Sequence, residues 1–231
     1  MEINGLMIAP GADLAGADLS NASLVGEDMT DARMAGAILA GSDLKRAQLI
    51  GADLRYSLCR KVLLEGADLH HANLWNADLE EASAREAVFS KCWLGSSNLI
   101  EADLRASDFS GAWITAADLT GALLSASTLA GASLARACMR ECDLTGAFAV
   151  GADFRSAILN GATIRATNLS GANLRGASLI DADLSLSDLI GTDLRGAQLD
   201  GALLNGSRHD GTTRWPEGFK PLTSGGIDPH E

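Results

Sequence analysis

The sequence predicts an all-β solenoid in which the chain turns once every five residues. Three observations predict it. A large apolar residue recurs at every fifth position from Leu14 to Leu204, which makes 39 units; 28 of these central positions hold Leu, and only Cys59, Ala84 and Ala149 deviate. Two residues before the centre, 27 of the 39 positions hold Ala. Two residues after the centre, 18 of the 39 positions hold Gly.

A period of five fits neither a continuous helix nor a continuous strand. Five steps of about 100° would carry the apolar side chains around a helix, and five steps along a strand would send successive ones to opposite faces. Both conflicts disappear if each unit is a short extended segment followed by a corner. The Ala and the centre then point inward together, and Gly suits the positive φ of a type II turn at the corner.

Tandem units of the form Gly11-Ala12-Asp13-Leu14 resemble the pentapeptide repeat family, in particular its uninterrupted cyanobacterial members, over residues 11–206. The resemblance implies a right-handed quadrilateral parallel β-helix with four units per coil. The 39 units then make about ten coils, and a spacing of about 4.8 Å gives a rod of about 47 Å. Features that recur at a spacing of twenty support four units per coil, among them the pair Trp93 and Trp113.

Short caps are expected at both ends, because an open solenoid end exposes strand edges and apolar side chains. Residues 1–10 are assigned to an N-terminal cap, 11–206 to the β-helix, and 207–231 to a C-terminal cap and tail. We expect Trp215 and Phe219 to fold back over the last coil, and the tail from Leu222 to Glu231 to be disordered.

Composition narrows the function classes. The net charge of −12 argues against direct nucleic-acid binding, which needs a basic surface. No apolar run approaches the roughly 20 residues of a membrane helix, and no secretory signal is visible, so a cytoplasmic protein is expected.

The four Cys show no paired spacing typical of disulfides or zinc. One Asp per outward segment is interpreted as a solubility pattern. No catalytic, cofactor or metal site is therefore expected.

Departures from the repeat concentrate on one of the four sides, the side whose centres are Leu14, Met34 and every twentieth residue thereafter. We call it the aromatic side. It has a net charge of +2, whereas the second and fourth sides have −6 and −5 and the third has −1. The candidate protein-binding residues on it are Tyr56, Trp75, Trp93, Trp113, Arg55, Arg155, Arg175 and Arg195.

Exposed aromatic residues flanked by Arg have the composition of a protein-binding hot spot. Two other interpretations stay open: a stack of Trp that only stabilises the wall, and a homodimer contact. The three Arg that follow Asp153, Asn173 and Asp193 are expected to form solvated pairs with them in preference to an anion site.

Eight consecutive corners, from His71 to Ala106, lack Gly. Because non-Gly residues resist positive φ, the sequence predicts that these corners switch to a turn with αR character and change the cross-section of the rod.

Two functions remain open. The first is a non-enzymatic scaffold or regulator that docks an unidentified protein partner on the aromatic side, similar to regulatory pentapeptide repeat proteins of cyanobacteria. The alternative is an acidic mimic of DNA that acts on a topoisomerase such as DNA gyrase, which the resemblance implies through quinolone-resistance members of the family. The unbroken repeat frame weighs against the second, because those members rely on projecting loops or a C-terminal dimerisation helix.

Overall fold

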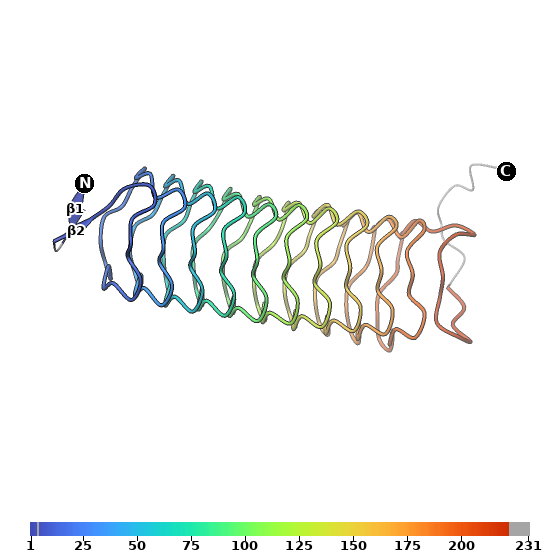
Figure 1. The fold of residues 1–231 in the computed structure, drawn as a ribbon. Helices are drawn as coiled ribbons and strands as arrows, with labels where there is room; N and C mark the ends of the chain where they lie inside the picture. Colours follow the sequence, from blue (N-terminus) through green and yellow to red (C-terminus); the bar gives the residue numbers. More distant parts are fainter. Residues whose placement is uncertain (4, 222–231) are drawn as a thin grey trace.

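The structure, a computed structural model, describes residues 1–3 and 5–221 as a straight rod of stacked coils (Figure 1). The expected disordered tail, Leu222 to Glu231, lies outside the described residues. The rod is a right-handed quadrilateral β-helix, as expected. Parallel bridges join residues twenty apart without a break from Asp13↔Arg33 to Asp188↔Arg208, so four units make one coil. No helix among the described residues is long and apolar enough to cross a membrane.

The backbone hydrogen bonds of one unit explain its sequence. In the unit Ala52–Tyr56, the amide of Ala52 closes the preceding turn and that of Asp53 donates to the previous coil. The amides of Leu54 and Tyr56 donate to the next coil. Only the amide of Arg55 has no backbone acceptor, and the Asp53 carboxylate accepts it at 3.2 Å.

This bond between an Asp or Asn and the amide two residues later recurs along the rod, for example from Ser110 to Asp108 and from Ser170 to Asn168. A backbone amide left without an acceptor is unfavourable, and Asx side chains commonly accept such amides. Where the repeat has an Asp or Asn at this position, its side chain can therefore complete the hydrogen bonding of its unit, a local role beyond the solubility pattern expected from the sequence.

The corner prediction is wrong. All eight Gly-free corners from His71 to Ala106 have φ between 54° and 61°, and all 21 non-Gly corners of the rod have φ between 54° and 62°. In each turn the third of the four residues has the positive φ, and the amide of the fourth donates to the carbonyl of the first, as Ala17 does to Leu14 at 3.1 Å. This combination is the pattern of a type II turn.

The hydrogen bonds between neighbouring coils explain why the non-Gly corners keep a positive φ. From Gly11 to Leu186, each corner amide donates to the next coil, as Tyr56 does to the Trp75 carbonyl at 3.0 Å. A different turn at one corner would break such bonds on both neighbouring coils. The left-handed conformation costs about 1–2 kcal/mol per non-Gly residue, and the surrounding hydrogen bonds and buried centres impose it.

The core is a set of apolar ladders along the inside of the rod. The central residues and the inward Ala are almost all fully buried. Phe89 and Phe109, one coil apart, stack with ring centroids 4.8 Å apart and planes 3° apart. Where Ser replaces the inward Ala, its hydroxyl donates to a turn carbonyl, as Ser57 does to Leu54 at 2.7 Å. Buried hydroxyls are thus satisfied locally.

A short hairpin starts the chain. Strands β1 (Glu2–Ile3) and β2 (Leu6–Met7) pair antiparallel, with Ile3 opposite Leu6. Both of these side chains pack against the core, and Ile8 is buried. The apolar face of this hairpin therefore contacts the N-terminal end of the core.

At the other end, the ladder runs past residue 206. Arg208 and Arg214, which the sequence pattern assigns to the C-terminal cap, still pair with Asp188 and Asp193. The second spacing is 21 in place of 20, so one extra residue enters the final turn. Trp215 then packs against the core and stacks on Phe219 at a centroid distance of 5.3 Å.

Candidate functional site

Two columns of outward side chains run along the aromatic side, one residue before and one residue after each buried centre. The first column contains Trp93 and Trp113, and the second contains Trp75. Their side chains are 47%, 43% and 40% exposed, respectively, although they are large and apolar. Three indoles on consecutive coils thus face solvent on one side of the rod.

Trp93 and Trp113 form a stack. They are bridge partners in the ladder, their ring centroids are 4.8 Å apart and their planes differ by 29°. This distance equals the spacing between strands, so the ladder itself holds the two indoles in contact. The next ladder partner of Trp113 is the small residue Ser133, so the stack of aromatic rings ends at Trp113 on this side.

Trp75 is held differently. Its ring lies across the next coil at Gly95, where a Cβ atom would overlap the ring, with Cε3 of Trp75 only 2.6 Å away. Gly95 does not have the positive φ of the corner glycines, so the backbone conformation does not require Gly there. The absence of a side chain at residue 95 provides the room that the Trp75 ring occupies.

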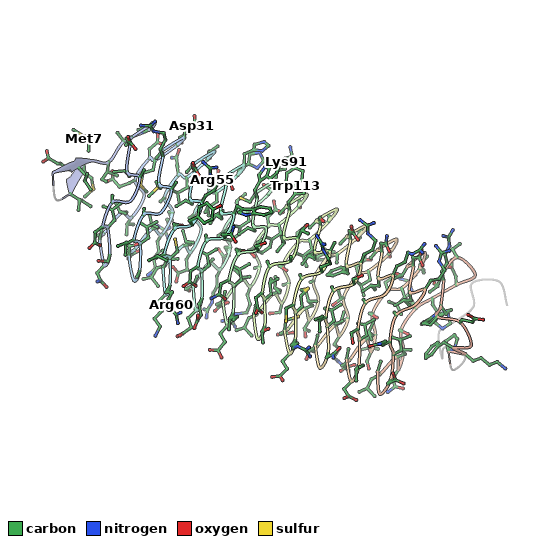
Figure 2. The ribbon with its side chains drawn as sticks, turned by 60° about the horizontal axis from the view of Figure 1, so that its bottom comes forward. Met7, Asp31, Arg55, Arg60, Lys91 and Trp113 are labelled. Atoms are coloured by element: carbon green, nitrogen blue, oxygen red, sulfur yellow. The ribbon has the colours of Figure 1, made fainter. Side chains whose placement is uncertain are left out.

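Tyr56 and Arg55 extend the aromatic side toward the N-terminus. Tyr56 occupies a corner and is 60% exposed, and Leu58 is exposed just beyond this corner. The Arg55 guanidinium donates to both oxygens of Asp53, at 2.8 and 2.7 Å. These hydrogen bonds lower the pKa of Asp53 and raise the pKa of Arg55, so the pair stays ionised at neutral pH. In Figure 2, Arg55 and Trp113 lie along one stretch of the rod, whereas Arg60 projects from another part of the surface.

Beyond Trp113 the surface falls into a shallow hollow with a volume of about 430 Å³. It forms because the two columns continue with small residues one coil later. Its lining residues are Thr115, Ser133, Ala135, Arg136, Arg155 and Ser156. The hydroxyl oxygens of Thr115 and Ser133 are 3.2 Å apart and link its floor across the two coils.

The column of Arg155, Arg175 and Arg195 begins in the lining of the hollow. Arg155 donates to Asp153 at 2.9 and 2.7 Å, and Arg195 donates to Asp193 at 2.9 and 2.6 Å. Hydrogen bonds from Arg155 lower the pKa of Asp153, and those from Arg195 lower the pKa of Asp193 to about 2. The pairing within one coil that the sequence predicts is therefore present for these two.

Arg175 differs, because residue 173 is an Asn. The Asn173 side chain accepts the Arg175 backbone amide at 3.2 Å, and no ion pair of the Arg175 guanidinium occurs among the described residues.

The predicted residues thus form two zones and not one continuous patch. Tyr56, Arg55 and the three Trp lie before the hollow, and the Arg column begins in its lining with Arg155 and continues beyond it. Sequence reasoning missed Gly95 and Arg136. The available signals were their positions, since Gly95 is twenty residues after Trp75 and Arg136 is the corner that follows the small residues Ser133 and Ala135.

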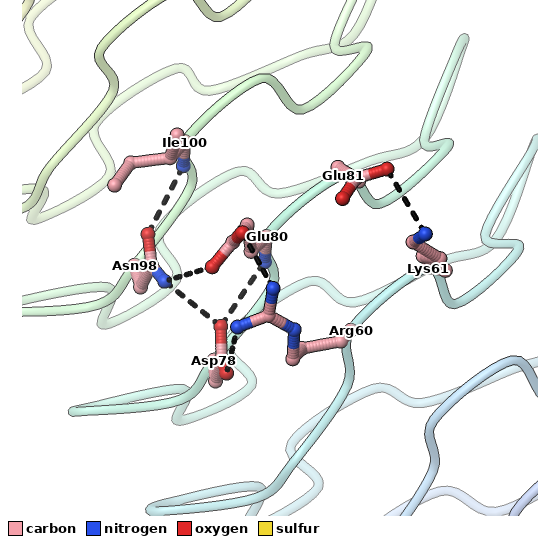
Figure 3. A network of polar contacts seen from close by, with 7 residues as sticks. All are labelled: Arg60, Lys61, Asp78, Glu80, Glu81, Asn98 and Ile100. Carbon is pink, nitrogen blue, oxygen red and sulfur yellow. Dashed lines mark hydrogen bonds and ion pairs between the residues drawn. The ribbon is translucent and has the colours of Figure 1, made fainter.

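Other surfaces of the rod are occupied by polar contacts between side chains. On the second side, Arg60 pairs with Glu80, and Asn98 donates to Asp78 at 3.0 Å and to Glu80 at 3.2 Å (Figure 3). Lys61 pairs with Glu81 at the adjacent corner. Within residues 1–3 and 5–221, no group of three His, Cys, Asp or Glu side chains could hold a metal ion.

Comparison with known proteins identifies the repeat. The family model described as "Pentapeptide repeats" matches with 8 copies, over residues 12–49, 47–83, 85–121, 114–146, 137–176 and 167–206. No functionally curated protein matches the chain.

Solved structures resemble the rod. HetL, a pentapeptide repeat protein involved in heterocyst differentiation regulation in the cyanobacterium Nostoc sp. strain PCC 7120, is 30% identical. The match covers 86% of this chain and 89% of HetL, with a TM-score of 0.57. A pentapeptide repeat protein of the Arabidopsis thaliana thylakoid lumen is 34% identical over 42% of this chain and 68% of its own, with a TM-score of 0.41. QnrB1, a plasmid-mediated fluoroquinolone resistance protein, is 18% identical over 75% and 89%, with a TM-score of 0.37.

Proposed function

The chain belongs to the pentapeptide repeat family, and we propose that it is a non-enzymatic binding scaffold whose aromatic side docks a protein partner. The observation that carries this proposal is the set of three exposed indoles on the one side with a positive net charge. Trp, Tyr and Arg are the residues most enriched in binding hot spots. A rigid ladder holds them in place, so little side-chain freedom would be lost on binding.

The similarity to HetL supports a regulatory role. HetL is described as involved in the regulation of heterocyst differentiation, and its likeness spans most of both chains. A regulator that works by docking needs a shaped surface and no catalytic groups. The aromatic side provides such a surface, whereas on the second side Arg60, Asp78, Glu80 and Asn98 are paired with one another (Figure 3).

Affinity capture with matched variants tests the proposal. The tagged protein would capture partners from a lysate of the source organism, followed by mass spectrometry and measurement of Kd with the purified partner. We expect Trp93→Ala/Trp113→Ala to weaken this Kd at least tenfold while the circular dichroism spectrum is retained. The control is Phe148→Ala/Leu203→Ala, which removes two equally exposed apolar side chains from the fourth and third sides. Equal affinity of both double variants for the partner would refute the proposal.

The charges of the second and fourth sides favour one alternative, an acidic mimic of DNA that acts on a topoisomerase. Two arguments weigh against it. Charges of −6 and −5 along about 47 Å are sparse beside duplex DNA, which carries one negative charge per about 1.7 Å. In addition, the ladder between Asp13 and Arg208 is unbroken, so no inserted loop projects from this part of the described chain. Supercoiling by DNA gyrase, measured with the protein in molar excess, tests the alternative, and inhibition would establish it over the scaffold.

A further inference from the structure

The hollow beyond Trp113 brings three kinds of recognition group together on three consecutive coils. Trp113 lies next to it, as the ladder partner of the lining residue Ser133. Thr115 and Ser133 place hydroxyl groups on the floor, and Arg136 and Arg155 line the far side. An aromatic face next to guanidinium and hydroxyl donors suits a ligand that is apolar at one position and anionic at the next.

The charges around the hollow are unbalanced. Arg155 is paired with Asp153, but Arg136 has no ion pair with any acidic residue in the part of the chain that the structure describes. Arg136 occupies a corner with φ of 59° and is exposed. One uncompensated guanidinium therefore borders the hollow, on a protein whose net charge is −12.

We propose, resting on the function proposed above, that the partner presents an acidic extended segment, one carboxylate of which enters the hollow and binds Arg136. An apolar or aromatic side chain of the same segment covers Trp113. The acidic second and fourth sides repel such a segment, and the aromatic side with its net charge of +2 attracts it. Electrostatics thus selects both the face and the register of docking.

The spacing of the site agrees with an extended segment that runs along the rod. The Trp113 and Ser133 coils are adjacent and lie about 4.8 Å apart, and alternate side chains of an extended chain lie about 6.6 Å apart on one face. A Glu side chain is long enough to span the difference between these two spacings and to contact Arg136. An apolar residue at one position and Glu two positions later therefore meet Trp113 and the hollow together.

Fluorescence anisotropy with a defined probe tests this inference. The probe is a fluorescein-labelled ten-residue peptide in which Glu alternates with Leu, compared with versions that carry Gln or Lys in place of Glu. We expect the Glu peptide to bind, and to bind at least tenfold more tightly than the Gln peptide. We also expect its affinity to fall as salt rises from 50 to 500 mM, because salt screens exposed charges.

Two matched variants assign the binding to the hollow. Arg136→Gln should weaken binding of the Glu peptide at least fivefold. Arg140→Gln, which removes an equally exposed charge four residues later on the second side, should leave it within twofold. Equal effects of the two variants, equal affinity for the Glu and Gln peptides, or no binding at 1 mM peptide would overturn the inference. The scaffold proposal fails separately, if the natural partner binds the Trp93→Ala/Trp113→Ala variant as tightly as the wild type.

Discussion

The indole of Trp75 lies across the backbone of Gly95, in the space that a side chain at residue 95 would fill. The two residues are twenty apart, so they occupy the same column on consecutive coils. A missing side chain on one coil thus sets the position of an aromatic side chain from the coil before. This relationship makes Gly95 part of the aromatic side although it presents no group to a ligand.

Substitution of Gly95 should displace Trp75. We expect Gly95→Ala to destabilise the fold by about 1–2 kcal/mol, the usual cost of forcing packed groups apart, and to shift Trp fluorescence to longer wavelength. Chemical denaturation and emission spectra measure the two effects. Gly211→Ala is the control, because Gly211 has no positive φ and no atom lies within 4 Å of the place its new methyl group would take. This variant should change neither quantity, and an equal response of both variants would contradict the prediction.

At the corners, substitution of Ala by Gly should change stability in the opposite direction from the same substitution elsewhere. Ala126 has φ of 58°, a conformation that Gly adopts at little cost and Ala does not. Ala126→Gly should therefore stabilise the protein by about 0.5–1 kcal/mol. Ala15→Gly, at an exposed position without positive φ, should instead destabilise it by about 0.5 kcal/mol. Thermal unfolding midpoints of the two variants test the claim, which would fail if both moved in the same direction.

The Asx bond to the backbone should depend on shape and not on charge. Asp108 accepts the amide of Ser110 at 2.8 Å. Asp108→Asn keeps an acceptor oxygen and should have a small effect on the free energy of unfolding. Asp108→Ala removes the acceptor and should cost about 1 kcal/mol, as loss of one hydrogen bond usually does. If the Asn and Ala variants unfold at the same denaturant concentration, the carboxylate serves another purpose.

Asp103 should make stability depend on pH in the acid range. Hydrogen bonds from Arg105 and Arg85 lower the pKa of Asp103 to about 2, while an unfolded chain has a value of about 3.9. Because the folded pKa is the lower one, the stabilisation is present above pH 4 and is lost as the pH falls toward 2. At pH 6 we expect the free energy of unfolding of the wild type to be about 1 kcal/mol higher than that of Asp103→Asn. The gain is limited because the Arg partners are partly exposed to solvent. Denaturation at several pH values measures the difference, and a gap that persists at pH 2 would exclude this origin.

The thiols should differ in reactivity. Burial raises the pKa of Cys59 and Cys142 to about 12 and also raises the pKa of Cys92. Their thiolates are scarce at pH 8, and the thiolate is the reactive form. Only the half-buried Cys138 should react with iodoacetamide in the native protein, as intact-mass spectrometry would show. All four free cysteines should react in denaturant, and native labelling of Cys138→Ser would contradict the assignment.

Much of the fold could be predicted from the five-residue repeat of the sequence. The repeat placed each apolar centre inside, and the spacing of twenty placed Trp93 over Trp113. The prediction of altered corners failed because it weighed the local preference of residues such as Glu81 and Lys91 alone. Hydrogen bonds to the coils on both sides outweigh that preference, and they are visible only in the assembled rod.

The sequence by itself determined the architecture and the side on which the aromatic residues gather, because position in a regular repeat fixes the direction of each side chain. Only the tertiary structure decided how those side chains lie. The cover of Gly95 by Trp75 and the hollow beside Arg136 depend on the sizes of residues one coil apart, which lie about 4.8 Å from one another in space and twenty residues apart in the chain. Contacts between coils, and not the local pattern, therefore shape the surface that a partner would meet.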